Sequence, residues 1–137
     1  MIDIKNRYTE AHLNAKEYLS FFKSLLPIMP HEYDLKKFEE LVKFFYESII
    51  PHFDEEEEFL QELFETHPSR KTIKVILKIQ KEHLEILAMF ETFVEKIKTI
   101  EDSKAEEIDL THLCISVIDA VLKHADYEDR NLAPLFK

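Results

Sequence analysis

The sequence predicts an all-α protein: an up-down-up-down antiparallel four-helix bundle in a single domain over residues 1–137. Three observations lead to this prediction. The chain has no glycine, whereas the tight two-residue hairpins of β-sheet proteins usually require it. Apolar residues recur at alternating steps of three and four in four segments, which is the spacing of a helix with one buried face. Short connections between these segments favour antiparallel neighbours.

Two helices are expected in the first half of the chain. The first covers about residues 3–26 and ends where a proline-containing segment begins. The second covers about residues 34–65, with Asp34 as its expected N-cap. Pro51 lies inside this second helix, and a proline there removes a backbone hydrogen bond and clashes with the preceding turn. We therefore expect a kink just before His52.

Two more helices are expected in the second half. The third covers about residues 69–100 and has Ser69 as its expected N-cap. The fourth covers about residues 109–132, where Asp109 can play the same part. A strongly charged segment separates these two helices, and we expect it to be a loop.

Composition and charge exclude several classes of function. A chain without glycine cannot form a phosphate-binding loop or a dinucleotide-binding turn. The 18 Lys and Arg residues against 28 Asp and Glu give a net charge of −10, which disfavours nucleic acid or an anionic membrane as the main partner. The single cysteine, Cys114, cannot form an internal disulfide. The N-terminus is polar and no apolar run reaches the ~18 residues of a membrane span, so we expect a cytoplasmic protein.

Polar residues interrupt all four apolar stripes. Each stripe carries one histidine, and two stripes add a glutamate four residues later, so that each His–Glu pair projects from one face of its helix. Burying a carboxylate without a partner is costly, and these residues therefore need a common explanation. We call them the six inward residues: His12, His52, Glu56, His83, His124 and Glu128.

Their spacing predicts that they meet. His12 and His52 are 40 positions apart (52 − 12), and His83 and His124 are 41 apart (124 − 83). The midpoint of each pair falls in an expected loop, and residues equally far from the turn of an antiparallel hairpin lie level with each other. All four histidines should therefore share one depth of the bundle, with the glutamates one turn away. This arrangement predicts a metal site of four imidazoles and two carboxylates.

The donor set narrows the choice of metal. Six protein ligands are too many for one tetrahedral zinc ion, and neutral nitrogen donors suit magnesium and calcium poorly. A mixed set of imidazoles and carboxylates suits iron or manganese. Two ions would use all six residues if each bound two histidines and the ions shared the carboxylates and a solvent oxygen.

Two stretches of the chain resemble a known family. Residues 52–56 (HFDEE) are similar to the His-Phe-x-x-Glu-Glu motif of the hemerythrin-like proteins, also called HHE cation-binding domains. Residues 124–136 (HADYEDRNLAPLF) resemble the family's ending, and the resemblance extends over essentially the whole chain. It implies a four-helix bundle whose six inward residues bind two non-haem iron ions with an oxo or hydroxo bridge.

The chain departs from the oxygen-carrying members of that family at two positions. Those members have a fifth histidine one turn before the histidine of the third helix, where this chain has Ile79. They also place the last carboxylate five residues after its histidine, where this chain has Asp129. Helix geometry favours Glu128, because five residues rotate the side chain by about 140° and four by only about 40°, but both remain open here. The set of four histidines and two glutamates is more similar to iron-centre repair proteins and iron-sensing domains of the family.

The resemblance leads us to expect a protein that binds or senses a small diatomic ligand, O₂ or NO. With Ile79 in place of a fifth histidine, more coordination positions should stay open, and oxidation should compete with reversible binding. Two alternatives are an enzyme that repairs iron centres or reduces NO or peroxide, and a protein that stores or handles iron. An enzyme would need an electron donor, and the sequence offers no second redox cofactor, which favours a binding protein but leaves an enzyme open. Whether the apolar helices form a homodimer or bind another protein is left open.

Three expectations concern polar residues and the thiol outside this set. The acidic run over residues 54–58 should be a solvated face except for Glu56. Cys114, between two apolar neighbours in a helix, should be an inert buried side chain. The remaining histidines should not contribute to the site: His31 and His67 are expected in loops, and His112 on the surface.

Overall fold

The structure, a computed structural model, describes residues 4–25, 31–99 and 104–135, with side chains over residues 10–25, 36–99 and 109–135. Nearly all of these residues are helical, and no strand occurs among them. No helix within these ranges is both long and apolar enough to cross a membrane. The elements are α1 (Ile4–Leu25), α2 (His31–Phe44), the π-helical turn η2 (Phe45–Ile49), α3 (Ile50–Thr66), α4 (Arg70–Thr99), α5 (Lys104–Asn131) and the short 3₁₀ helix η3 (Ala133–Leu135).

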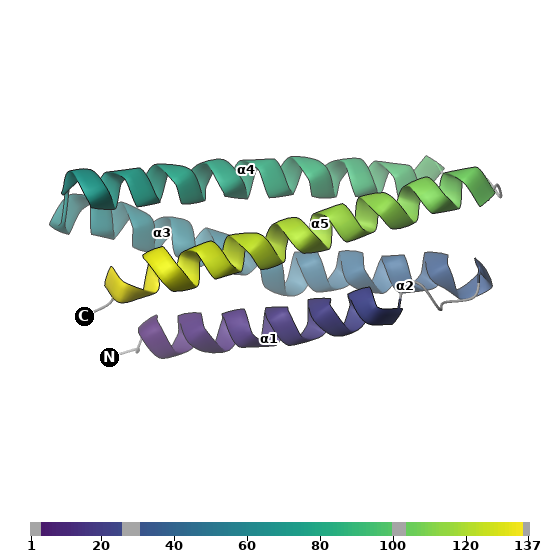
Figure 1. Cartoon of the computed structure of the whole chain (residues 1–137), viewed down its shortest axis with the longest axis horizontal. Helices are drawn as coiled ribbons and strands as arrows, with labels where there is room; N and C mark the ends of the chain where they lie inside the picture. Colours follow the sequence, from purple (N-terminus) through teal and green to yellow (C-terminus); the bar gives the residue numbers. More distant parts are fainter. Residues whose placement is uncertain (1–3, 26–30, 100–103, 136–137) are drawn as a thin grey trace.

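The long helices alternate in direction along one common axis (Figure 1). α1 runs one way, and α2, η2 and α3 together form a single rod that returns the other way. α4 then runs parallel to α1 and α5 runs back, so that α1 begins and α5 ends at the same end of the molecule (Figure 1). The predicted up-down-up-down four-helix bundle is confirmed.

Two helices begin earlier than the sequence predicted. α2 begins at His31 and α5 at Lys104, so the expected N-caps Asp34 and Asp109 lie inside helices. His31 is likewise helical and not in a loop. Acidic residues are favourable near a helix N-terminus, where they interact with the helix dipole. A charged segment can therefore continue a helix, and charge alone did not mark these boundaries correctly.

The connection between α3 and α4 agrees with the prediction. It consists of residues 67–69, and the backbone N–H of His67 still donates to the carbonyl of Leu63 at 2.8 Å. Ser69 then caps α4, because its Oγ accepts a hydrogen bond from the backbone N–H of Thr72 at 3.1 Å. This bond satisfies one of the N–H groups that the first turn of a helix leaves without a partner.

The irregularity expected near Pro51 is a π-helical turn. Ile50 N–H donates to the carbonyl of Phe45, five residues earlier instead of four, and α3 then starts with Pro51 in its first turn. Proline has no N–H to donate to the preceding turn, and the hydrogen bonds depart from the α-helical spacing at this point. The π turn is thus the way the chain continues the rod in spite of the proline, immediately before His52.

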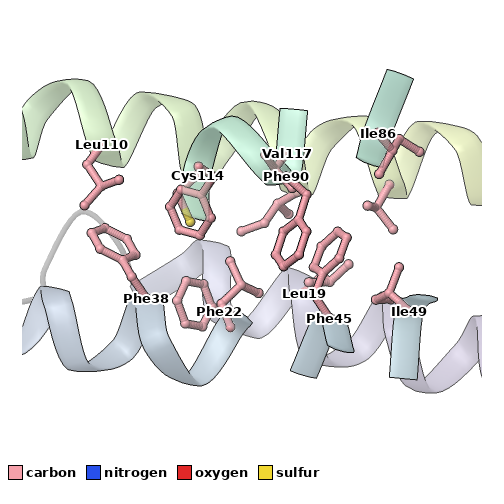
Figure 2. Packing of buried hydrophobic residues seen from close by; sticks show 14 of the residues in the cluster. Leu19, Phe22, Phe38, Phe45, Ile49, Ile86, Phe90, Leu110, Cys114 and Val117 are labelled. Atoms are coloured by element: carbon pink, nitrogen blue, oxygen red, sulfur yellow. The ribbon is translucent and has the colours of Figure 1, made fainter. Parts of the chain in front are cut away.

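Two apolar clusters fill the bundle, and a polar layer separates them. On α4, for example, His83 lies between Ile79 of the small cluster and Ile86 of the large one. Aromatic rings dominate the large cluster: those of Phe45 and Phe90 stack with centroids 4.1 Å apart (Figure 2). The large cluster comprises Leu19, Phe22, Phe38, Leu41, Phe45, Ile49, Phe53, Ile86, Phe90, Phe93, Leu110, Cys114, Val117, Ile118 and Val121. The small cluster comprises Leu60, Leu63, Val75, Ile76, Ile79 and Leu132.

Cys114 is fully buried in the large cluster, and burial raises the pKa of its thiol to about 12. We expect the native protein to resist a thiol reagent such as dithionitrobenzoate at about pH 8, because the thiolate is the nucleophile and is disfavoured in this environment. The same protein in concentrated guanidinium chloride should react with one equivalent. Absorbance of the released thionitrobenzoate measures both. Rapid stoichiometric reaction of the native protein would contradict the buried position.

Candidate metal centre

The structure brings the six inward residues together in the polar layer. α1 and α4 each supply one histidine, while α3 and α5 each supply a histidine and a glutamate. In two overlapping groups, one ligand atom from each residue lies within 4.8 Å of all the others. The first group is His12, His52, Glu56 and Glu128, and the second is Glu56, His83, His124 and Glu128.

Glu56 lies between the two histidine pairs. Its Oε1 is 2.7 Å from Nε2 of His83, and its Oε2 is 3.2 Å from Nε2 of His52. The two oxygens of one carboxylate therefore face imidazoles from opposite halves of the chain. This is the placement that a carboxylate needs in order to bridge two cations.

Glu128 is completely buried, and its Oε1 lies 3.1 Å from Nε2 of His12 and 3.2 Å from Nε2 of His124. Asp129 lies outside the layer, where its Oδ1 accepts a hydrogen bond from Nδ1 of His12 at 3.0 Å. The structure thus places Glu128, and not Asp129, with the inward residues. Asp129 lies five residues after His124, and this position is rotated too far around the helix to reach the centre.

Carboxylates also hold the outer nitrogens of two other histidines. Nδ1 of His83 donates to Glu57 at 2.9 Å, and Nδ1 of His124 donates to Glu82 at 2.8 Å. Gln80 fixes Glu57 in turn by donating to its other oxygen at 3.2 Å. Such bonds set the tautomer and the ring orientation, leaving Nε2 to face the centre. The expectation that Glu57 belongs to a purely solvated face was therefore wrong.

Glu57 and Glu82 were not identified from the sequence, because the prediction relied on the inward face of each helix and both residues lie beside that face. Each is the immediate sequence neighbour of an inward residue: Glu57 follows Glu56, and Glu82 precedes His83. One residue along a helix turns the side chain by about 100°, which points it at the flank of the adjacent helix. An acidic residue directly beside an inward residue, as at Glu57 and Glu82, is the signal that could have identified them.

Burial and mutual proximity shift the pKa values of the two inward glutamates in opposite directions. Burial acts to raise the pKa of Glu56, but Glu128 and the surrounding imidazoles outweigh it and hold that pKa well below 4.5. For Glu128, burial and the neighbouring Glu56 raise the pKa well above 4.5, against an opposing effect of His12. Burial also lowers the pKa of His12, but Glu128, Glu56 and Asp129 together raise it to about 9. Without a cation, the surroundings therefore favour the protonated forms of Glu128 and His12.

The layer is incompletely satisfied by the protein alone. Four of its buried atoms make no hydrogen bond of acceptable geometry within the described side chains: Oε2 of Glu56, Nε2 of His124 and both carboxylate oxygens of Glu128. Buried polar atoms without partners are rare, because each costs about 1–3 kcal/mol. All of them are imidazole or carboxylate lone-pair donors that converge on the same space. The residues therefore fit a pair of cations, which would supply the missing partners and offset two buried negative charges.

Cation uptake is expected to release protons. Below about pH 9, His12 carries a proton that a cation must displace. Between about pH 6.5 and pH 8, the apparent Kd for cobalt(II) should fall by about tenfold per pH unit for each displaced proton. Titrations at two pH values measure the change. Asp129→Asn should weaken the dependence, because that carboxylate helps to raise the pKa of His12, and a Kd independent of pH would contradict the expectation.

The comparisons with known proteins agree with this geometry. The family model of the hemerythrin HHE cation binding domain matches residues 3–136, nearly the whole chain. Neither the comparison with curated proteins nor that with solved structures found a match. The whole-length match and the helical bundle with its inward histidines and glutamates support one conclusion. The chain belongs to the hemerythrin family of HHE cation-binding domains.

Proposed function

We propose that the six inward residues hold two iron ions and that the protein binds or senses O₂ or NO at that pair. The observation that carries the proposal is the sharing of Glu56 and Glu128 between two groups of ligand atoms, each with its own pair of histidines. Each group would hold one cation, and Glu56 and Glu128 would serve both. A mixed set of imidazole and carboxylate donors suits iron or manganese, and the resemblance to the family favours iron.

The donor count supports ligand binding over a purely structural role. Two imidazoles and a share of two carboxylates leave positions free on an ion that prefers a higher coordination number. Ile79, one turn before His83, is fully buried in the small cluster and supplies no further nitrogen. When bound and reduced, an iron pair supplies the electrons that O₂ or NO binding requires.

The surrounding side chains hold the imidazoles and restrict water. The ring of Phe53 stacks on that of His83 with centroids 4.2 Å apart, and its edge meets His124 at 5.5 Å. The outer carboxylates orient the rings from the other side, through Nδ1. Packed apolar walls around such a site control solvent access, so the chain provides a preorganised and largely buried position for a small neutral ligand.

Anaerobic loading with iron(II) followed by stopped-flow mixing with O₂ or NO tests the proposal. We expect new near-ultraviolet and visible bands on mixing, and with O₂ a rapid conversion to the oxidised form. Ile79→His should lengthen the life of any oxygenated form, because it offers a further imidazole one turn before His83. Ile79→Val is the matched control for altered packing. A reduced, iron-loaded protein that is inert towards both gases would defeat the proposal, and a long-lived oxygenated form of the unmodified protein would defeat the role given to Ile79.

The same experiment separates the alternative functions. Repeated consumption of NO or peroxide in the presence of a reductant would indicate an enzyme. Uptake of many more than two irons per chain, without a response to either gas, would indicate iron storage. Binding of one ligand per iron pair without turnover supports the proposed binding or sensing role.

A further inference from the structure

His52 differs from the other inward residues in its exposure. Its side chain is 16% exposed, whereas that of Glu56 on the same helix is 1% and that of His83 is 4% exposed. The ring of His52 packs against that of His12, with centroids 5.0 Å apart. One edge of the otherwise buried layer therefore approaches the surface at His52.

A pocket of about 360 Å³ lies at this edge, between α1 on one side and η2 and the start of α3 on the other. His52 forms part of its wall, beside Ser48 of the π turn. The opposite wall comes from α1, where the small side chains of Ala11 and Ala15 leave the space open. A water molecule takes about 30 Å³ in the liquid, so the pocket has room for a cation with its hydration shell.

We propose that this pocket is the passage through which divalent cations reach the six inward residues, and that His52 is the first inward imidazole they meet. Glu10 and Glu55 line the pocket and attract cations, and the amide oxygen of Asn14 and the hydroxyl of Ser48 can replace water ligands. The proposal rests on the metal site proposed above, but not on the identity of the ion or of any gas.

The other sides of the layer are less suited to a cation. The large and small apolar clusters cover its two ends, and moving a charge through apolar packing is very costly. The imidazoles of His12, His83 and His124 are only 2–6% exposed, against 16% for His52. The pocket at His52 combines a polar lining, sufficient volume and a wall formed by an inward residue.

The π turn shapes this passage. Ser48 and Ile49 belong to the turn, and Pro51 lies two residues after it, so this part of the wall comes from the irregular segment and the start of α3. A π turn carries one extra residue per turn and widens the helix locally. It faces two alanines across the pocket, and this pairing of a widened helix with small side chains keeps the space unfilled.

Filling the pocket tests the proposal. In Ala15→Leu, we expect cobalt(II) loading of the metal-free protein and its release to a chelator both to slow by about tenfold. The larger side chain fills the pocket, and a close-packed interior leaves few voids through which an ion can pass. Stoichiometry and Kd should stay unchanged, since a passage affects both directions equally. Stopped-flow absorbance of the cobalt bands measures loading. Ala88→Leu, the same change at an exposed site on α4, is the matched control and should load at the normal rate.

A charge variant keeps the test decisive if Ala15→Leu does not fold, which far-ultraviolet circular dichroism would show. Glu10→Gln should slow loading by roughly threefold at low salt, and the difference should shrink at high salt because the attraction is electrostatic. Glu17→Gln removes an exposed carboxylate from the same helix outside the pocket lining and is the matched control. Equal slowing by both variants would show an effect of net charge only and would overturn the passage.

Each of the remaining outcomes either supports or overturns the proposed cation passage. Normal cobalt loading in a folded Ala15→Leu overturns the passage, even if its reaction with O₂ slows, because the pocket would then admit only small neutral molecules. A changed Kd with a normal loading rate overturns it too, since the substitution would be acting on the ligands. Failure of the unmodified protein to take up cobalt would overturn the metal site and the passage with it. Slower loading and release at constant Kd support the passage whatever the response to O₂ or NO.

Discussion

Glu56→Gln is expected to abolish the binding of both cations at once. Glu56 belongs to both groups of ligand atoms, with one oxygen 2.7 Å from His83 and the other 3.2 Å from His52. Glutamine has nearly the same shape but no charge, and its amide nitrogen cannot donate a lone pair. The metal content after equilibrium dialysis should therefore fall from about two ions per chain to near zero. Even the loss of a residue that only contacts a ligand lowers metal affinity by roughly tenfold or more, and the loss of a shared ligand should lower it further.

Glu57→Gln is the matched control, because it makes the same change at the next residue of the same helix. Glu57 touches the outer nitrogen of His83 and not the centre, so we expect two ions per chain with an affinity lowered by about 10–100-fold. Two ions bound by Glu56→Gln, or equal losses in both variants, would contradict the proposed sharing of Glu56 between two cations.

Removal of the cations is expected to lower the melting temperature by roughly 20–30 °C. An ion present at a thousand times its Kd stabilises the folded state by about 4 kcal/mol, and two ions by about 8 kcal/mol. For a chain of 137 residues, each kcal/mol changes the melting temperature by about 3–4 °C. The physical reason is the set of buried imidazole and carboxylate atoms that lack partners without the ions.

Calorimetry of the loaded protein with and without a strong chelator measures this shift. Glu56→Gln serves as the control, since a variant that binds no cation should melt at the same temperature in both conditions. A chelator that removes the metal without lowering the melting temperature of the unmodified protein would show that the protein alone stabilises its polar layer.

The spacing of the histidines shows how far sequence reasoning reached. His12 and His52, and likewise His83 and His124, were expected to lie level from their distances to the loops, and the structure brings all four together. The inference succeeded although two helices begin earlier than predicted, because the depth of a residue depends on its distance from the turn and tolerates a few residues of error. The N-caps, in contrast, depend on the boundaries themselves, and Asp34 and Asp109 were assigned wrongly.

Contacts between neighbouring helices could not be derived in the same way. Asp129 was a candidate for the centre, yet it bonds the outer nitrogen of His12 and also pairs with Lys16. Glu57 was expected to face only solvent, yet it holds His83. In each case the residue lies at the edge of the helix face, where a rotation of the helix by a few tens of degrees decides between solvent, the next helix and the centre.

The sequence by itself determined the four helices, the direction of their apolar faces and five of the six residues turned into the bundle, with Glu128 or Asp129 as the sixth. These properties follow from the periodicity of a single helix and from distances along the chain, and both can be read without knowing the neighbours. Only the tertiary structure decided that Glu128 takes the central position, which carboxylate meets each outer nitrogen, and that a pocket opens at His52. Those outcomes depend on the rotation and sliding of packed helices by a few ångströms, which no residue pattern within one helix specifies.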